Sequence, residues 1–254
     1  MGVPLELESV GKTFANGKVA VQRLDLTVAA GGFCSILGRS GCGKSTALRI
    51  VAGLVEASEG RVSFGEIGSD TRPRVGMVFQ ESALMPWRRV WGNVYLPLQV
   101  RGVSKKEARE QVDNALALVG LQDESERYPR QLSGGMKMRV SIARAIVQNP
   151  SVLLMDEPFG ALDEITRWRL NDELLKLWSL KGWTVLFVTH SVFESVYLSQ
   201  KVAVMSDAPG CVSGSVDVGA AYPRGDAFRV SSEYQSLCSR VSGLLRPAEA
   251  VSYP

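Results

Sequence analysis

The sequence lacks most of the features that mark secreted, membrane-spanning or metal-binding chains. Its four cysteines, Cys34, Cys42, Cys211 and Cys238, lie far apart, without the paired spacing of a zinc site or a disulfide framework. Its uninterrupted apolar runs are short, whereas a membrane span needs about 20 residues. The N-terminus, MGVPLELESV, has no basic segment followed by an apolar core, so we expect no secretory signal. These absences favour a protein of a reducing compartment.

The sequence also has little net charge and no low-complexity segment. The net charge is only +3 over 254 residues, and the basic residues are scattered, which argues against a nucleic-acid partner. The composition, 45% hydrophobic and 22% charged, is typical of a globular chain. No internal repeat is present. There is one histidine, His190, so any role that needs an imidazole falls on that residue.

The hydrophobic pattern predicts an α/β fold. The first 30 residues alternate polar and apolar positions, as half-buried antiparallel strands do. Buried-strand patterns follow at four places and alternate with helical patterns, which favours a mainly parallel sheet covered by helices. The strands are expected at Phe33–Leu37, 151–155, 184–188 and Lys201–Met205, and the helices at 45–54, 104–118, 136–147, 165–178 and Ser232–Leu245. The region of about 83–149 has no comparable strand and is expected to be an inserted helical subdomain.

Residues 38–45, GRSGCGKS, match the phosphate-loop pattern G-x-x-x-x-G-K-[ST] between a predicted strand and a predicted helix. Glycines allow backbone N–H groups to surround a phosphate, and the helix start adds partial positive charge. Lys44 would reach the β- and γ-phosphates, and Ser45 would be a Mg²⁺ ligand. A chance glycine-rich turn would not have both flanking elements, so we expect a nucleotide site.

Two further strand ends bring polar side chains to the same edge of the sheet. The segment SVLLMDEP, 151–158, delivers Asp156 and Glu157 at the end of an apolar strand, where ligands bind in such sheets. Asp156 suits the Mg²⁺ shell, and Glu157 is placed to orient or deprotonate a water molecule. His190 ends the next apolar strand, so we expect it at the same site and not in a structural role.

The segment LSGGMKMR, 132–139, places Ser133, Gly134 and Gly135 before a predicted helix. Two glycines at a helix start cost conformational entropy, so a close approach there is the expected reason for them. A hydroxyl and bare backbone N–H groups at a helix start form a second anion site. One nucleotide in a monomer would not explain two such sites, whereas sites shared between two subunits would.

In this order, the motifs resemble those of the ATP-binding subunits of ABC transporters over about residues 5–206. Residues 38–46 are similar to the Walker A motif of that family, 152–157 to Walker B, 132–135 to the signature, 161–163 to the D-loop, Gln80 to the Q-loop and His190 to the switch histidine. The resemblance implies a single ATP-binding domain over 1–254 with the P-loop NTPase (RecA-like) core, an N-terminal antiparallel β subdomain, the helical subdomain and a C-terminal tail of about 211–254. The signature departs from LSGGQ at Met136, which lacks the amide of glutamine.

The resemblance also implies ATP and Mg²⁺ as cofactors. Phe14 would stack on adenine, Glu157 would be the general base, and His190 would contact the γ-phosphate, with Gln80 also in the catalytic set. Mg²⁺ would be held by Ser45, Gln80 and Asp156. The nucleotide would be bound by Gly38, Arg39, Ser40, Gly41, Cys42, Gly43, Lys44, Ser45, Thr46, Ser133, Gly134, Gly135 and Asp163, with the signature residues acting on the ATP of the other subunit in a homodimer.

The resemblance further implies a separate transmembrane permease, a periplasmic binding protein and a peripheral position on the cytoplasmic face of a bacterial inner membrane. The segments at 80–94 and 156–178 are similar to the nitrate/sulfonate/taurine group of importers, with ATPases for thiamine precursors as a related possibility. Trp87, Arg88 and Trp91 favour an interface with the permease; the alternative is that the tryptophans belong to the core. Export, and less readily DNA repair or translation, are the alternative functions.

Two smaller interpretations stay open at this stage. Cys42 either has a lowered pKa and raised reactivity near the helix start, or is a small filler of the loop. The tail is expected to pack on the domain through Leu237, Val241, Leu244 and Leu245, and Ser232 with Gln235 resembles a capping box.

Overall fold

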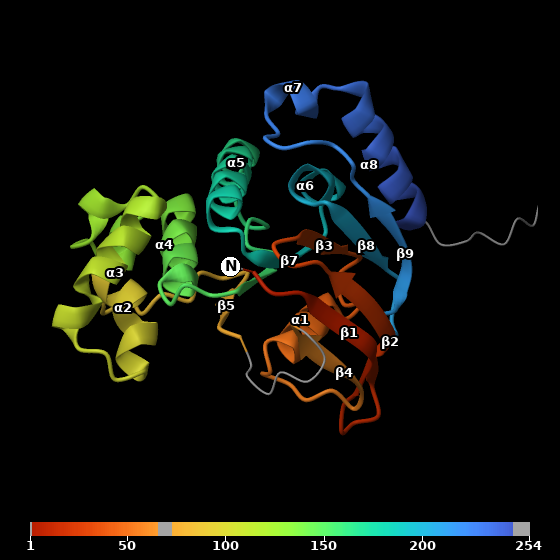
Figure 1. The fold of residues 1–254 in the computed structure, drawn as a ribbon, viewed down its shortest axis with the longest axis horizontal. Coiled ribbons are helices and arrows are strands. Elements are labelled where there is room, and N and C mark those ends of the chain that lie inside the picture. The colour runs from red at the N-terminus through yellow and green to blue at the C-terminus, as the bar shows by residue number, and fades with distance from the viewer. Residues whose placement is uncertain (1, 66–72, 246–254) are drawn as a thin grey trace, which may run out of the picture. The chain divides into compact units, whose positions relative to one another are not determined.

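The computed structural model describes residues 2–65 and 73–245, and the chain divides into two compact units. Of the described residues, one unit contains 2–4, 29–32, 64–65 and 73–186, and the other contains 5–28, 33–63 and 187–245. Figure 1 shows the elements with their labels. The last nine residues of the predicted tail, 246–254, lie outside the described part of the chain.

The second unit begins with the predicted antiparallel sheet. Strands β1 (Leu5–Thr13), β2 (Val19–Val28) and β4 (Glu59–Phe64) have the order β2-β1-β4. The apolar positions pair across β1 and β2, for example Leu7 with Leu26 and Val10 with Leu24, and all four side chains are buried. The alternating pattern of the first 30 residues is therefore confirmed.

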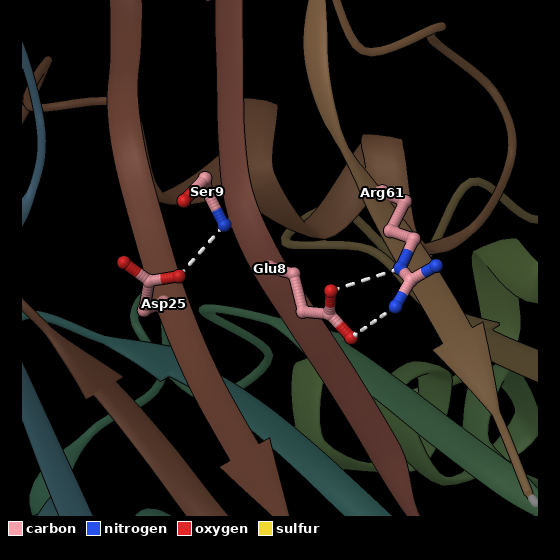
Figure 2. A network of polar contacts seen from close by, with 4 residues as sticks. All are labelled: Glu8, Ser9, Asp25 and Arg61. Atoms are coloured by element: carbon pink, nitrogen blue, oxygen red, sulfur yellow. Dashed lines mark hydrogen bonds and ion pairs between the residues drawn. The ribbon is translucent and has the colours of Figure 1, made fainter. Parts of the chain in front are cut away.

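A bulge interrupts the pairing of β1 with β2 after Leu7. Ser9 has a φ of 48°, and its N–H donates to Oδ1 of Asp25 at 2.7 Å. Beside it, Arg61 of β4 contacts both carboxylate oxygens of Glu8 at 2.9 and 3.0 Å, as Figure 2 shows. The Asp25 carboxylate thus supplies the acceptor that the irregular ladder does not.

The rest of the second unit surrounds the parallel strands β3 (Phe33–Leu37) and β8 (Lys201–Met205), with β9 (Val212–Asp217) antiparallel at the edge. The local strand order is β7-β3-β8-β9, in which β7 (Thr184–Thr189) contributes its last three residues to this unit. The helices are α1 (Lys44–Val51), α6 (Val192–Leu198), α7 (Asp226–Arg229) and α8 (Ser232–Leu245). Helix α1 ends before the predicted residue 54 because the chain turns at Gly53, where φ is 72°.

The first unit combines strands with helices. Strands β5 (Val75–Val78), β6 (Val152–Asp156) and the start of β7 have the order β5-β6-β7, and β5 and β6 are parallel. The helices are α2 (Val90–Val100), α3 (Lys105–Leu118), α4 (Gly134–Ile146) and α5 (Glu164–Lys181), with short 3-10 turns at Gln122–Glu124 and Pro129–Gln131. The segment 83–149, described in full, contains helices and turns but no strand.

The sequence predicts a capping box at two helices, and the structure has it at one of them. Ser104 and Glu107 form the predicted capping box of α3. At α8 the capping residue is Ser231, whose Oγ accepts the N–H of Tyr234 at 3.1 Å, so the predicted box of Ser232 and Gln235 is wrong. Leu237 and Val241 are buried as expected, but Leu244 is exposed.

The helical spacing over 165–178 correctly predicts α5 but not which of its side chains are buried. Leu174 and Trp178 belong to the core, whereas Ile165 and Trp168, in the first turns, are exposed. Within the described ranges, no helix has the length and apolar character needed to cross a membrane.

Candidate functional site

The phosphate loop joins β3 to α1, as predicted. Gly41 has a φ of 83° and Gly43 a φ of 107°, values that side chains with a Cβ rarely adopt. A Cβ on Gly43 would lie 2.3 Å from the carbonyl oxygen of Ala20, so this glycine is also required by the close approach of β2. The two glycines therefore allow the loop to turn tightly into the start of α1.

Lys44 is the first residue of α1, and only 4% of it is exposed. Its Nζ lies 2.9 Å from the carbonyl oxygens of Gly38 and Arg39. The ammonium group is thus held over the loop by main-chain acceptors of the loop itself. A phosphate bound in the loop would offer charged oxygens to the same ammonium group, which form stronger hydrogen bonds than neutral carbonyls do.

Cys42 is a filler of this loop and not a reactive thiol. Its side chain is buried, and burial raises its pKa despite the nearby charge of Lys44. A Cβ on Gly38 would lie 2.8 Å from Cys42 Sγ, which shows how tightly the sulfur is packed. The interpretation that the helix start activates this thiol is therefore wrong, because desolvation of the thiolate outweighs the attraction of the positive groups.

Phe14 follows directly after β1, in the turn that leads to β2, and remains 39% exposed. Lys12 Nζ lies 5.6 Å from the centre of its ring. Strand β2 also contacts the phosphate loop through Ala20, described above. The hairpin that carries Phe14 is therefore attached to the loop, and part of the Phe14 side chain remains exposed.

His190 follows the last residue of β7 and is exposed in a turn with its own hydrogen bonds. Thr189 Oγ1 donates to Oε2 of the buried Glu194 at 2.6 Å and accepts the N–H of Ser191 at 3.0 Å. Ser191 caps α6 by accepting the N–H of Glu194. These bonds fix the backbone on both sides of His190, and sequence reasoning did not single out Thr189 or Glu194. The Ser-x-x-Glu spacing of Ser191 and Glu194 at a helix start is the sequence pattern that could have indicated Glu194.

In the first unit, Asp156 is the last residue of strand β6, and Glu157 follows it. Asp156 is buried, whereas Glu157 is half-buried and has a φ of 44°, an unusual conformation for a residue with a long side chain. Strained backbone of this kind is concentrated at functional sites. Val78 of β5 pairs with Met155 of β6, so Gln80, which follows β5, leaves the sheet at the same edge as the two carboxylates. The ends of β5 and β6 therefore direct Gln80, Asp156 and Glu157 to one edge of this sheet.

The chain after Gln80 is held by a residue that the sequence did not reveal. Arg144 of α4 donates to the carbonyl oxygens of Ser82 at 2.7 Å and Ala83 at 2.8 Å. Ala83 has a φ of 44°, so this turn is strained. Burial lowers the pKa of Arg144, yet an arginine remains charged at any pH of interest. Helix α4 thereby links the signature segment at its start to the segment of Gln80.

The signature residues lie at the start of α4. Ser133 is exposed, and its Oγ accepts the N–H of Met136 at 3.3 Å as the helix cap. A Cβ on Gly134 would lie 3.2 Å from Cδ2 of Leu162, and a Cβ on Gly135 would lie 2.8 Å from Cγ2 of Thr166. The glycines therefore have a packing role within the chain, in addition to any approach of a ligand.

The same packing brings the signature beside Asp163. This residue caps α5, with its carboxylate 2.9 Å from the N–H of Thr166, and that hydrogen bond lowers its pKa. Leu162 and Thr166, the two residues against which the glycines pack, lie on either side of it. The structure thus places Ser133, Gly134 and Gly135 next to the D-loop residue.

The three residues expected at a permease interface differ in their surroundings. Trp87 is 73% exposed. Trp91 is half-buried, donates from Nε1 to Asp113 at 2.9 Å and lies against Tyr95, with ring centres 5.1 Å apart. Arg88 donates to Gln99 at 2.7 Å. Trp87 is therefore a surface residue, and Trp91 belongs partly to the packing of the helices.

Comparison with known proteins identifies the family. The family model described as ABC transporter matches residues 21–160. The aliphatic sulfonates import ATP-binding protein SsuB of Bacillus subtilis is 39% identical over 235 residues, which are 92% of this chain and 89% of that protein. These matches extend well beyond the phosphate loop.

Two solved structures have the same fold. The ATP-binding cassette MJ0796, in a dimeric post-hydrolysis state with ADP and Pi bound, superposes with a TM-score of 0.73 at 32% identity, covering 85% of this chain and all of that one (100%). The protein cbiO1 of Clostridium perfringens, part of the ABC transporter complex cbiONQ, has a TM-score of 0.75 at 27% identity, with 84% and 88% covered. Together with the phosphate loop, the carboxylates after β6 and the capped signature helix, these findings show that the chain belongs to the ABC transporter family, as an ATP-binding subunit with ATPase activity.

Proposed function

We propose that this subunit powers the import of a small solute through a separate permease, as a homodimer in which each ATP is bound between two subunits. The observation that carries the proposal is that one chain has two glycine-containing helix starts suited to bind an anion. One is the phosphate loop with its buried Lys44, and the other is the exposed, Ser133-capped start of α4. Under this proposal, the phosphate loop of one subunit and the signature of its partner hold the same ATP.

Each predicted site residue has a role in this proposal. Lys44 would exchange the carbonyl oxygens of Gly38 and Arg39 for the β- and γ-phosphates, and Phe14 would stack on the adenine. Glu157 would accept a proton from the attacking water, and His190 would contact the γ-phosphate. Ser133, Gly134 and Gly135 would stabilise the γ-phosphate of the partner's nucleotide, with Asp163 beside them. The remaining loop residues Arg39, Ser40, Gly41, Cys42, Gly43, Ser45 and Thr46 would contribute mainly backbone N–H groups.

The residues also fit Mg²⁺. A hydroxyl from Ser45, a carboxylate from Asp156 and an amide oxygen from Gln80 are the hard oxygen donors that Mg²⁺ prefers. In the described ranges no group of three or more His, Cys, Asp or Glu side chains could hold a metal alone. This agrees with a Mg²⁺ ion that arrives with the nucleotide, whose phosphates supply further ligands. When bound, the ion would neutralise charge on the phosphates.

Import of a sulfonate-like or related small solute is favoured by the relatives. The SsuB protein named above is an aliphatic sulfonate import protein, and it matches along 92% of this chain. A nitrate-, taurine- or thiamine-precursor-like solute is compatible with the same resemblance, and export is the alternative. A periplasmic binding protein would select the solute, and the subunit would lie on the cytoplasmic face of the inner membrane, attached through the permease.

We place the contact with the permease at Trp87 and Arg88, near Trp91. Exposed tryptophan and arginine side chains are the residue types that most often dominate protein interfaces. An indole that is 73% exposed has much apolar surface to bury in a partner.

The proposal is tested by reconstitution. The subunit would be co-expressed with a candidate permease, and ATP-dependent uptake of an alkyl sulfonate into proteoliposomes would be measured. ATP-driven uptake that requires both proteins is expected, and Lys44→Ala should abolish it. Accumulation in the opposite direction would favour export. A subunit that hydrolyses ATP but does not associate with the co-expressed permease would contradict a transport role.

A further inference from the structure

A cleft in the first unit has no part in nucleotide binding or in the proposed permease contact. Its volume is about 520 Å³, and it lies where α2, α3, α4 and α5 end. Its apolar part includes Leu98, Leu118 and Ile146. Arg74, Arg101 and Lys181 line it as well, and no acidic side chain among the described residues does so.

The three cations leave the cleft with unused hydrogen-bond donors. Arg74 donates to the carbonyl oxygen of Gln148 at 3.2 Å, and Arg101 donates only weakly to the side-chain oxygen of the same residue, at 3.4 Å. Each guanidinium carries five N–H groups, so most of them remain available. No ion pair joins Arg74, Arg101 or Lys181 to an acidic group in the described ranges.

Helix ends offer another use for cations, because the C-terminus of a helix carries partial negative charge. In α2 and α5, backbone N–H groups already donate to several of the last carbonyl oxygens. The carbonyl oxygens of Leu98 and Gln99 in α2 accept the N–H groups of Arg101 and Gly102, and that of Trp178 in α5 accepts the N–H of Gly182. The side chains of Arg101 and Lys181 therefore do not serve as caps and remain available to a ligand.

Trp183 adds an aromatic ring to the apolar side of the cleft. Trp183 lines the cleft and is only 2% exposed. Its Nε1 has no hydrogen-bond acceptor among the described residues. That nitrogen is itself closed to solvent, so a ligand in the cleft would contact the ring of Trp183 and not its Nε1.

From these features we infer that the cleft binds a small organic anion with an apolar portion. The acidic group would bind to Arg101 and Lys181 with Arg74, and the apolar portion would contact Leu98, Leu118 and the ring of Trp183. A carboxylate, sulfonate or phosphate group would accept hydrogen bonds from these donors equally well. The class of ligand is therefore an apolar molecule that carries one such acidic group. The site is an effector site, separate from the phosphate loop, and it does not depend on the transported solute.

The probe is hexane-1-sulfonate, titrated calorimetrically into the full chain with saturating ATP to occupy the phosphate loop. Saturable binding is expected, and it should weaken at least tenfold in the Arg101→Gln/Lys181→Gln variant. The matched control is Arg169→Gln/Lys176→Gln, which removes the same two residue types from exposed positions of α5 outside the cleft. The control loses the same net charge, but from positions outside the cleft. Wild-type affinity is therefore expected for it.

Three further measurements separate the sources of binding. Sulfate should bind more weakly than hexane-1-sulfonate, and hexan-1-ol should not bind measurably, if both parts of the ligand contribute. Vesicles of phosphatidylglycerol should not bind through Arg101 and Lys181 if the ligand is a free small molecule. The inference is overturned if the probe does not bind saturably, if both double variants bind it equally, or if only the vesicles discriminate between them.

Discussion

Gly135 in the signature segment packs directly against Thr166 in the first turn of α5: a Cβ on Gly135 would lie 2.8 Å from Cγ2 of Thr166. A real Cβ atom does not approach a neighbour that closely, so either the Thr166 side chain or one of the two helices would have to shift. The signature glycine is therefore required by packing inside the subunit, whatever its role toward a nucleotide.

This contact predicts a rescue. Gly135→Ala should destabilise the subunit by about 1–3 kcal/mol, the usual cost of overpacking. Thr166→Ser, which removes only Cγ2, should recover most of that loss in the double variant. Urea unfolding of the two single variants and the double variant measures the coupling. Equal losses in Gly135→Ala with and without Thr166→Ser would show that the contact is not the cause.

The tail should stabilise α6 through Arg224. This buried guanidinium donates to the carbonyl oxygens of Val196, Tyr197 and Ser199 at 2.8–2.9 Å, and it lies over the ring of Tyr222. Arg224→Met should cost roughly 2–4 kcal/mol in the free energy of unfolding, because the carbonyl oxygens lose their donors. Arg224→Lys should recover part of it.

The control for this prediction is Arg61→Met. That arginine also makes a bidentate contact, to Glu8, but on the surface of the N-terminal sheet (Figure 2), where ion pairs contribute little. Thermal unfolding followed by circular dichroism compares the variants. A loss in Arg224→Met no larger than that in Arg61→Met would contradict the role assigned to the tail.

Cys42 should resist alkylation near neutral pH. Burial raises its pKa, and the thiolate is the reactive form, so the fraction able to react falls at any given pH below that pKa. Iodoacetamide labelling followed by mass spectrometry should modify the half-exposed Cys211 before Cys42, and the rate at Cys42 should rise as the pH increases. Labelling of Cys42 ahead of Cys211 at pH 7 would contradict the structure.

Trp87 and Trp91 should separate coupling from stability. Trp87→Ala removes an exposed side chain and should leave the unfolding temperature unchanged while reducing permease-dependent transport. Trp91→Ala removes the contact with Tyr95 and the hydrogen bond to Asp113, and should cost about 1–3 kcal/mol. Differential scanning calorimetry and proteoliposome uptake on both variants test this. Normal transport with Trp87→Ala would remove Trp87 from the interface.

Elements with a local cause were predictable from the sequence. The phosphate loop needs glycines and a lysine at set positions, and the capping box of α3 needs only Ser104 and Glu107. Strand β6 is buried on both faces and therefore forms a continuous apolar run. Each of these patterns lies within a few consecutive residues, so tertiary structure is not needed to interpret it.

What depends on distant contacts was not predictable. Strand β5 has only four residues, which is too short for a repeating pattern of apolar and polar residues to be recognised. Arg144 appears in the sequence as one helical residue among many, and its acceptors at Ser82 and Ala83 are set by the packing of α4. The sequence left a reactive thiol and a filler open for Cys42 for the same reason, since its burial depends on neighbours far along the chain, such as Gly210, where a Cβ would lie 2.0 Å from the Cys42 carbonyl oxygen.

The composite site is the central claim, and Ser133→Asp tests it most directly. Aspartate preserves the cap of α4, because its carboxylate also accepts the N–H of Met136, but it places a negative charge where the partner's γ-phosphate would bind. Ser133→Asn, which caps the helix without charge, is the matched control and should retain part of the activity. ATP affinity and hydrolysis would be measured on the same samples. The account predicts wild-type affinity for ATP in Ser133→Asp with hydrolysis reduced about a hundredfold or more, and hydrolysis at the wild-type rate, or loss of ATP binding, would contradict it.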